Sequence, residues 1–128
     1  NWKLITENFI EDYHLPIADK ATVGAWFALN KTVFPKDTYE SFTYQTFMKT
    51  GNSTYGQAHP DNTTLKNQWR NTSVLPTMFP THMYVLAPDH LWYLSLRSRG
   101  IAEVEIRFCA AIAPEVDAAL SDASERAT

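Results

Sequence analysis

The chain of 128 residues has room for one domain and little more, and 45% of its residues are hydrophobic, enough for a real core. Its net charge is −3 and no basic run is present, which argues against nucleic acid as the main partner. No window approaches the about 20 apolar residues of a membrane span, so we expect no membrane partner.

Helical spacing of apolar residues predicts a first helix over residues 5–14. Phe9 and Ile10 belong to a set that recurs at intervals of three and four positions, and Thr6 is a candidate N-cap. Pro16 is expected to end the helix, because proline donates no backbone hydrogen bond and disfavours helical geometry in the residue before it.

Two strands are expected next, over residues 22–29 and 39–48. The second segment alternates between apolar and polar side chains, with Phe42, Tyr44 and Met48 on one face. This alternation is typical of a half-buried strand.

A long polar stretch follows, residues 50–72, with scattered glycine, proline and asparagine. We interpret it as a loop or flap with a short helix near residues 65–69. Three more strands are then expected, over residues 82–87, 91–97 and 102–112.

The last of these strands alternates, so that Val104, Ile106 and Phe108 share one face. It also carries Cys109, which we expect to be a buried small residue. Because a lone cysteine forms no internal disulfide, a reducing, cytoplasmic compartment is favoured.

Residues 115–127 are expected to form a second helix, with acids in its first turn as the helix dipole prefers. The order of helix, strands, long loop, antiparallel strands and helix predicts an α+β domain, a curved antiparallel sheet with helices over one face. The chain starts at Asn1 without a methionine and stops at Thr128 within the expected helix, so we interpret it as a piece of a longer protein.

The segment "ENFIEDYHLPIAD", residues 7–19, places four acids and a histidine among apolar residues. Iron(II) enzymes that activate oxygen favour two histidines and one carboxylate as ligands. His14 and Asp19 are five residues apart, about 140° on an ideal helix, so they converge only if the helix ends between them. The alternative is a solvated helix face beside a hydrogen-bonded core histidine.

Six aromatic side chains and one histidine are candidates for the lining of a substrate cavity. These candidates are Trp26, Phe27, Phe42, Tyr44, Phe47, His82 and Trp92. Ordinary structural packing is the alternative for each of them. We expect His59 on a surface loop and His90 in the turn that follows Pro88.

The opening stretch "NWKLITENFIEDYH" resembles the start of the catalytic domain in the alpha subunits of Rieske non-haem iron ring-hydroxylating oxygenases. The positions that match the family's motif are Asn1, Trp2, Lys3, Glu7, Asn8, Phe9, Glu11, Tyr13 and His14. A later stretch, "SVLPTMFPTHMYVLAPDHLWYLSLRSRG", is similar to the family's mid-sheet region.

This resemblance implies a helix-grip fold (Bet v 1/START-like), a curved antiparallel sheet wrapped around helices with a cavity between them. Residues 1–128 would form part of the catalytic domain, and the Rieske [2Fe-2S] domain would lie outside this chain. The parent enzyme would insert oxygen from O2 into an aromatic or similar hydrophobic substrate at a mononuclear Fe(II). A reductase or ferredoxin would donate the electrons, and the parent would be a homo-trimer.

The resemblance also implies roles for three residues. His14 would be an iron ligand, and Glu11 would be the acid that relays electrons from a neighbouring subunit's cluster. Asp19 stands where the family has its second ligand histidine, and we expect this shorter, anionic side chain to bind iron weakly. The family's third ligand, an acid on a later helix, has no match in this sequence.

Two hypotheses from other classes stay open. A metal-free module that binds hydrophobic ligands would keep the cavity and lose the iron, which suits an aspartate at position 19. A scaffold subunit that shapes a trimer is the other. The metal content of the purified protein separates the enzyme from both alternatives.

Overall fold

The computed structural model describes residues 1–15, 17–22, 24, 27–37, 41–51 and 54–126. Within these ranges the chain forms two α-helices, α1 (Trp2–Ile10) and α2 (Pro114–Arg126), a short 3₁₀ helix and six strands. The strands are β1 (Phe27–Val33), β2 (Phe42–Lys49), β3 (Thr72–Met78), β4 (His82–Leu86), β5 (His90–Ser98) and β6 (Val104–Ile112).

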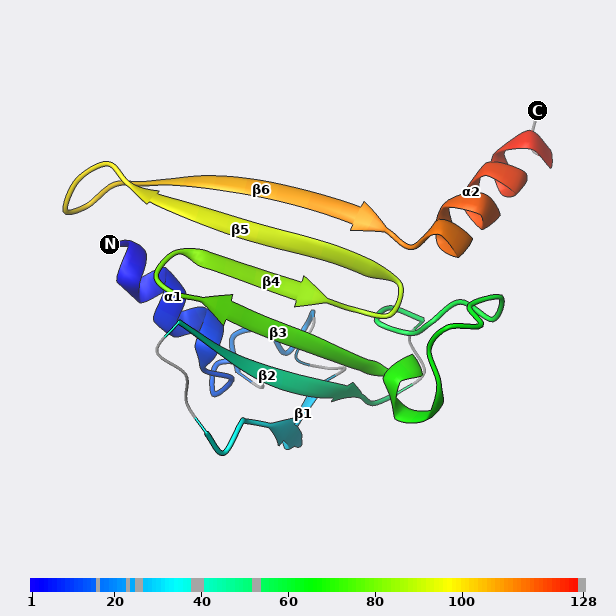
Figure 1. Ribbon diagram of the computed structural model, residues 1–128, viewed down its shortest axis with the longest axis horizontal. Coiled ribbons are helices and arrows are strands. Elements are labelled where there is room, and N and C mark those ends of the chain that lie inside the picture. The colour runs from blue at the N-terminus through cyan, green and yellow to red at the C-terminus, as the bar shows by residue number, and fades with distance from the viewer. Residues whose placement is uncertain (16, 23, 25–26, 38–40, 52–53, 127–128) are drawn as a thin grey trace.

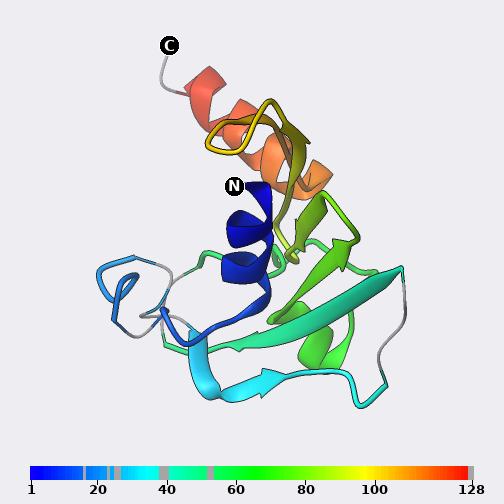
Figure 2. The same cartoon turned by 90° about the vertical axis from the view of Figure 1, so that its left-hand side faces the viewer.

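The six strands form one antiparallel sheet in which each strand pairs with the next one along the chain. Figure 1 shows this sheet from β6 to β1, with α2 beyond the end of β6. Figure 2 shows α1 in the bend of the sheet, which curves around it. The expected α+β class and helix-grip arrangement are therefore confirmed.

Helix α1 begins and ends earlier than the sequence predicted. Asn1 is the N-cap, because its side-chain oxygen accepts a hydrogen bond from the Lys3 N–H at 3.1 Å. The expected cap, Thr6, lies inside the helix, where its hydroxyl donates to the Trp2 carbonyl. At the other end, Glu11 has extended backbone angles and stops the helix ahead of His14.

Two contacts hold α1 against the sheet. The ring of Phe9 packs edge-to-face on Trp92 of β5, with ring centroids 6.0 Å apart. The side-chain amide of Gln45 on β2 donates to the Phe9 carbonyl at 2.9 Å, which satisfies an acceptor at the end of the helix. We call the face of the sheet toward α1 the inner face and the opposite face the outer face.

The inner face carries the core. Phe47, Met83, Val85 and Leu96 are all buried there, on strands β2, β4 and β5. Side chains alternate along each strand, so the residues between them belong to the outer face.

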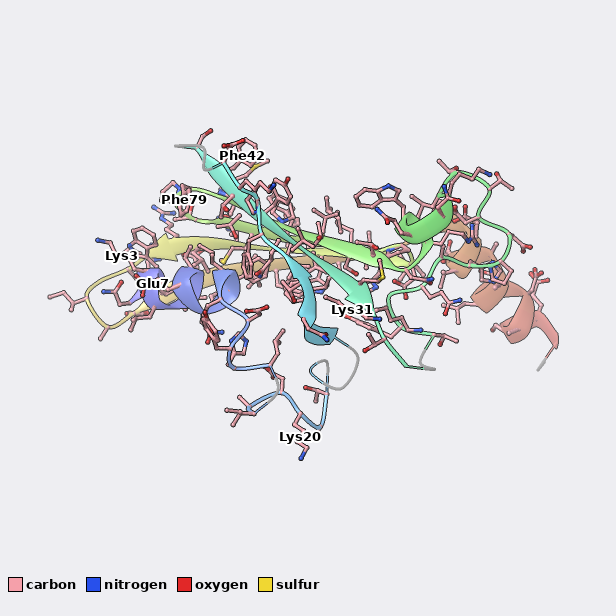
Figure 3. The ribbon with its side chains drawn as sticks, turned by 90° about the horizontal axis from the view of Figure 1, so that it is seen from below. Lys3, Glu7, Lys20, Lys31, Phe42 and Phe79 are labelled. Carbon is pink, nitrogen blue, oxygen red and sulfur yellow. The ribbon has the colours of Figure 1, made fainter. Side chains whose placement is uncertain are left out.

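Strand β2 alternates as expected, but the opposite way round. Its buried side chains are Gln45 and Phe47, which pair with Leu75 and Ser73 of β3. Phe42 and Tyr44 therefore belong to the outer face, and Figure 3 shows Phe42 on the side of the sheet away from α1.

One segment in the middle of the chain differs from expectation, and the segment before it agrees. The sequence assigned no strand to residues 72–78, which form β3 with Pro76 inside it. The loop expected over residues 50–72 is confirmed for its described part up to residue 71, and a 3₁₀ helix at Asn67–Arg70 lies close to the predicted short helix. The Arg70 guanidinium holds this loop in place by donating to the carbonyls of His59, Asn62 and Leu65.

The C-terminal elements follow the sequence prediction closely. Val104, Ile106 and Phe108 share one face of β6, as their pairing with alternate residues of β5 requires. Cys109, expected to be buried, is exposed on the other face. We call the loop over residues 54–71 the polar segment. Helix α2 is joined to it by a hydrogen bond from the Asn62 amide to the Glu115 carboxylate at 3.1 Å.

Replacing Met83 by alanine tests the assignment of the two faces. Met83 is 0% exposed, so its loss leaves a cavity under the sheet, and we expect the free energy of unfolding to fall by about 2–5 kcal/mol in urea. Met78→Ala is the matched control, because Met78 is 50% exposed on the outer face, and should cost less than about 0.5 kcal/mol. Equal losses in the two variants would contradict the assignment.

Candidate functional site

Three side chains converge just after the end of α1. The Nδ1 atom of His14 donates to the Glu11 carboxylate at 2.5 Å. The other ring nitrogen of His14, Nε2, lies 3.5 Å from the carboxylate of Asp19. All three are partly exposed, with 25% of the His14 side chain and 36% of each carboxylic side chain accessible to solvent.

The backbone after α1 turns back on itself and so brings Asp19 to His14. The N–H groups of Ile17 and Ala18 both donate to the His14 carbonyl, and the N–H of Gly24 donates to the Asp19 carbonyl. A side chain at position 24 would clash with the Leu15 backbone oxygen, so glycine is required for this close approach.

Glu11 both ends the helix and orients the histidine. One of its oxygens accepts from the Tyr13 N–H at 2.7 Å, and the other accepts from His14. Burial disfavours the charged form of Glu11, but these hydrogen bonds outweigh it and lower the pKa of the carboxyl below its ordinary value. Glu11 is therefore an acceptor, which leaves the Nδ1 proton on His14.

The spacing of His14 and Asp19 is compatible with a cation shared between them. With its proton on Nδ1, a neutral His14 ring turns the Nε2 lone pair toward a carboxylate oxygen 3.5 Å away. Two acceptors at this distance repel each other unless a proton on Nε2 or a shared cation lies between them. Two ligand atoms bound at about 2.0–2.2 Å to one metal ion are about 3.0–3.5 Å apart. The distance between His14 Nε2 and the Asp19 carboxylate oxygen is therefore compatible with ligation of one ion by both.

The donor set is incomplete in the described part of the chain. No group of three or more His, Cys, Asp or Glu side chains there is arranged to hold a metal ion. Glu11 belongs to the support of the site, because a metal-ligating histidine commonly donates its second N–H to a carboxylate. His14 Nε2 and the Asp19 carboxylate are therefore candidate metal-donor atoms.

The three side chains also line a cavity of about 240 Å³ between α1 and the inner face of the sheet. We call it the first chamber. Most of its wall is apolar, from Ile5, Phe9, Leu15, Phe47, Leu75, Trp92 and Leu94. A polar cluster at the edge of an apolar chamber is a common form of ligand site.

The predicted lining residues divide between the two faces. Trp92 lies on the inner face and lines the first chamber. Phe42, Tyr44 and His82 belong to the outer face, and the exposed His82 ring is hydrogen-bonded to Ser95 at 3.2 Å. Trp26 lies outside the described residues.

Phe47, one of the predicted lining residues, does line the first chamber, whereas sequence reasoning missed Gln45. Gln45 and Phe47 are two residues apart on one strand, so their side chains lie on the same face. This alternation is the sequence pattern that could have placed Gln45 in the cavity wall. Gln45 is only 3% exposed, and among the described residues its side-chain oxygen has no hydrogen-bond partner. Gln45 thus adds a hydrogen-bond acceptor to a wall that is mostly apolar.

The chain belongs to the family described as "Ring hydroxylating alpha subunit (catalytic domain)", which it matches over residues 1–128. No curated protein and no solved structure matched the chain. Membership of an oxygenase family does not favour the metal-free binding module. Among the described residues, the helices are too short or too polar to cross a membrane.

Glu11→Gln tests the link between Glu11 and His14 through its pH dependence. Because the pKa of folded Glu11 is lowered, its carboxylate stabilises the fold above the unfolded pKa, near 4.5, and this contribution is lost as the pH falls through the folded value. We expect the stability difference between wild type and Glu11→Gln to be constant near neutral pH and to shrink below about pH 4.5 in urea titrations.

Glu7→Gln is the control for this experiment, because it removes an exposed carboxyl of α1 and changes the net charge equally. A difference for Glu11→Gln that persists unchanged down to about pH 2 would contradict the hydrogen bond to His14.

Proposed function

We propose that this chain forms the iron-binding and substrate-binding part of an oxygenase that inserts oxygen from O2 into aromatic or similar hydrophobic compounds. The observation that carries the proposal is the convergence of Glu11, His14 and Asp19 at the edge of an apolar chamber. Family membership supports the reaction class.

His14 through Nε2 and Asp19 through Oδ2 would hold a mononuclear Fe(II). A bound iron of this kind supplies the activation of O2, with electrons delivered from a [2Fe-2S] cluster and a reductase or ferredoxin. Glu11 keeps the proton on His14 Nδ1, so that Nε2 stays available as a donor atom.

The first chamber would hold the substrate next to this cluster. Its mostly apolar wall favours a ring-shaped hydrophobic ligand, which Trp92 and Phe47 can contact. Because Glu11 is 36% exposed, it remains accessible from outside the chain, which suits a role in electron relay between subunits of a trimer.

Iron(II) binding tests the two proposed ligands. In anaerobic titrations we expect weak binding by the wild-type chain and none by His14→Ala. Asp19→His should bind at least about tenfold more tightly, because a second neutral imidazole suits oxygen-activating iron better than a carboxylate. His82→Ala, which alters an exposed histidine of the outer face, should bind like wild type.

Two outcomes would contradict this assignment. Unchanged affinity in Asp19→His would mean that position 19 does not face the metal. Unchanged affinity in His14→Ala would place the iron elsewhere.

Turnover tests the proposed reaction itself. In the protein that carries this chain together with its Rieske cluster and reductase, isotope-labelled O2 should deliver label into a hydroxylated aromatic product. His14→Ala should abolish incorporation and His82→Ala should leave it unchanged. Incorporation at the wild-type rate in His14→Ala would exclude a catalytic role for this site.

A further inference from the structure

A second, smaller chamber of about 90 Å³ adjoins the first. Four residues line both chambers, namely Leu15, Phe47, Leu75 and Trp92, so the two spaces lie side by side under the inner face. The second chamber ends at His90 and Tyr55. Together the chambers reach the lower end of ligand-pocket volumes, about 300 Å³.

An Asp–His pair closes the far end of the second chamber. The Nδ1 atom of His90 donates to the Asp89 carboxylate at 2.7 Å, and both side chains are largely buried, at 14% and 16% exposed. The tilted ring of Tyr55 packs against His90 with centroids 4.6 Å apart. His90 was expected in a turn, but it is the first residue of β5 and its side chain belongs to the inner face.

Asp89 is itself held in place by the polar segment. Its second carboxylate oxygen accepts from the Gly56 N–H at 2.9 Å. Burial opposes ionisation of Asp89, but the hydrogen bonds from His90 and Gly56 outweigh it and lower the pKa of the carboxyl. A charged Asp89 accepts the Nδ1 proton and therefore fixes the orientation of the His90 ring.

The other nitrogen of this ring is an unused hydrogen-bonding group. Nε2 of His90 is buried and has no hydrogen-bond partner among the described residues. Buried polar atoms in proteins nearly always have a partner, because leaving one unpaired costs free energy. With its proton on Nδ1, the neutral ring presents a lone pair at Nε2, which is an acceptor.

We propose that His90, oriented by Asp89, is a specificity-determining residue that accepts a hydrogen bond from a hydroxyl group on an aromatic ligand. This rests on the proposed function, since the ring of that ligand would occupy the space shared with the first chamber. A phenol fits the chemistry, with a donor for Nε2 and an apolar body for Leu75 and Trp92.

The surroundings favour a neutral hydroxyl over an anionic group. The wall near His90 is mainly apolar, with Val85 and Phe47, so a carboxylate would lose its hydration there. The charge of Asp89, adjacent to the ring, also repels an anion. The chamber is therefore expected to discriminate phenol from both anisole, which lacks the donor, and benzoate, which is charged.

The test compares these three probes on the 128-residue chain by calorimetry at neutral pH. We expect phenol to bind about fivefold more tightly than anisole, as one net hydrogen bond provides, and benzoate to bind most weakly. His90→Phe keeps an aromatic ring and removes the acceptor, so the preference for phenol should disappear. His82→Phe, the same substitution on the outer face, should retain it.

A second measurement needs no substitution. The nitrogen NMR signal of His90 Nε2 should be that of an unprotonated ring nitrogen and should shift when phenol is added, but not when anisole is added. This keeps the test decisive if His90→Phe fails to fold.

The outcomes separate this inference from the proposed function. If phenol and anisole bind equally well, or if His90→Phe retains the preference, His90 does not select the ligand, while the cavity stands. If no aromatic probe binds at all, the substrate cavity itself is wrong, and the inference falls with it.

Discussion

The hydrogen bond from His14 to Glu11, at the end of α1, is the interaction on which the candidate site depends. Glu11 stops the helix through its extended backbone and its bond to the Tyr13 N–H. Because the helix stops there, the chain can fold back and bring Asp19 to within 3.5 Å of His14. A helix continued through residue 19 would separate the two side chains by about 140°. One carboxylate thus determines both the backbone path and the orientation of the imidazole.

The sheet supplies the other half of the site. Its curvature leaves room beneath α1, and the contacts of Phe9 with Trp92 and Gln45 set the height of the helix above the strands. The two chambers in this space have different chemistry. The first has the Glu11–His14–Asp19 cluster at its edge, and the second ends at an imidazole oriented by a buried acid. A ligand lying across both would have its reactive ring near one histidine and its polar substituent near the other.

The sequence predicts those features that depend on local pattern. The alternation of apolar and polar residues in β6 correctly predicts that Val104 and Phe108 lie on one face. The motif around His14 correctly predicts the family. The end of α1 is not predicted, because a side-chain bond from Glu11 competes with the helical backbone. The faces of β2 are not predicted either. They depend on its register with β3, a strand that pattern reasoning passes over because Pro76 cannot donate in a ladder. The inward position of His90 is likewise a result of pairing between distant strands.

The most direct test of the account follows iron(II) by NMR under anaerobic conditions, because a paramagnetic ion broadens the signals of nearby nuclei. We expect broadening to appear first at His14, at Asp19 and at the indole of Trp92. The chain has a second histidine–acid pair with a similar separation, His59 and the exposed Asp61 at 3.6 Å, which serves as an internal comparison. Broadening that appears first at His59, with His14 unaffected, would contradict the claim that the cluster after α1 holds the metal.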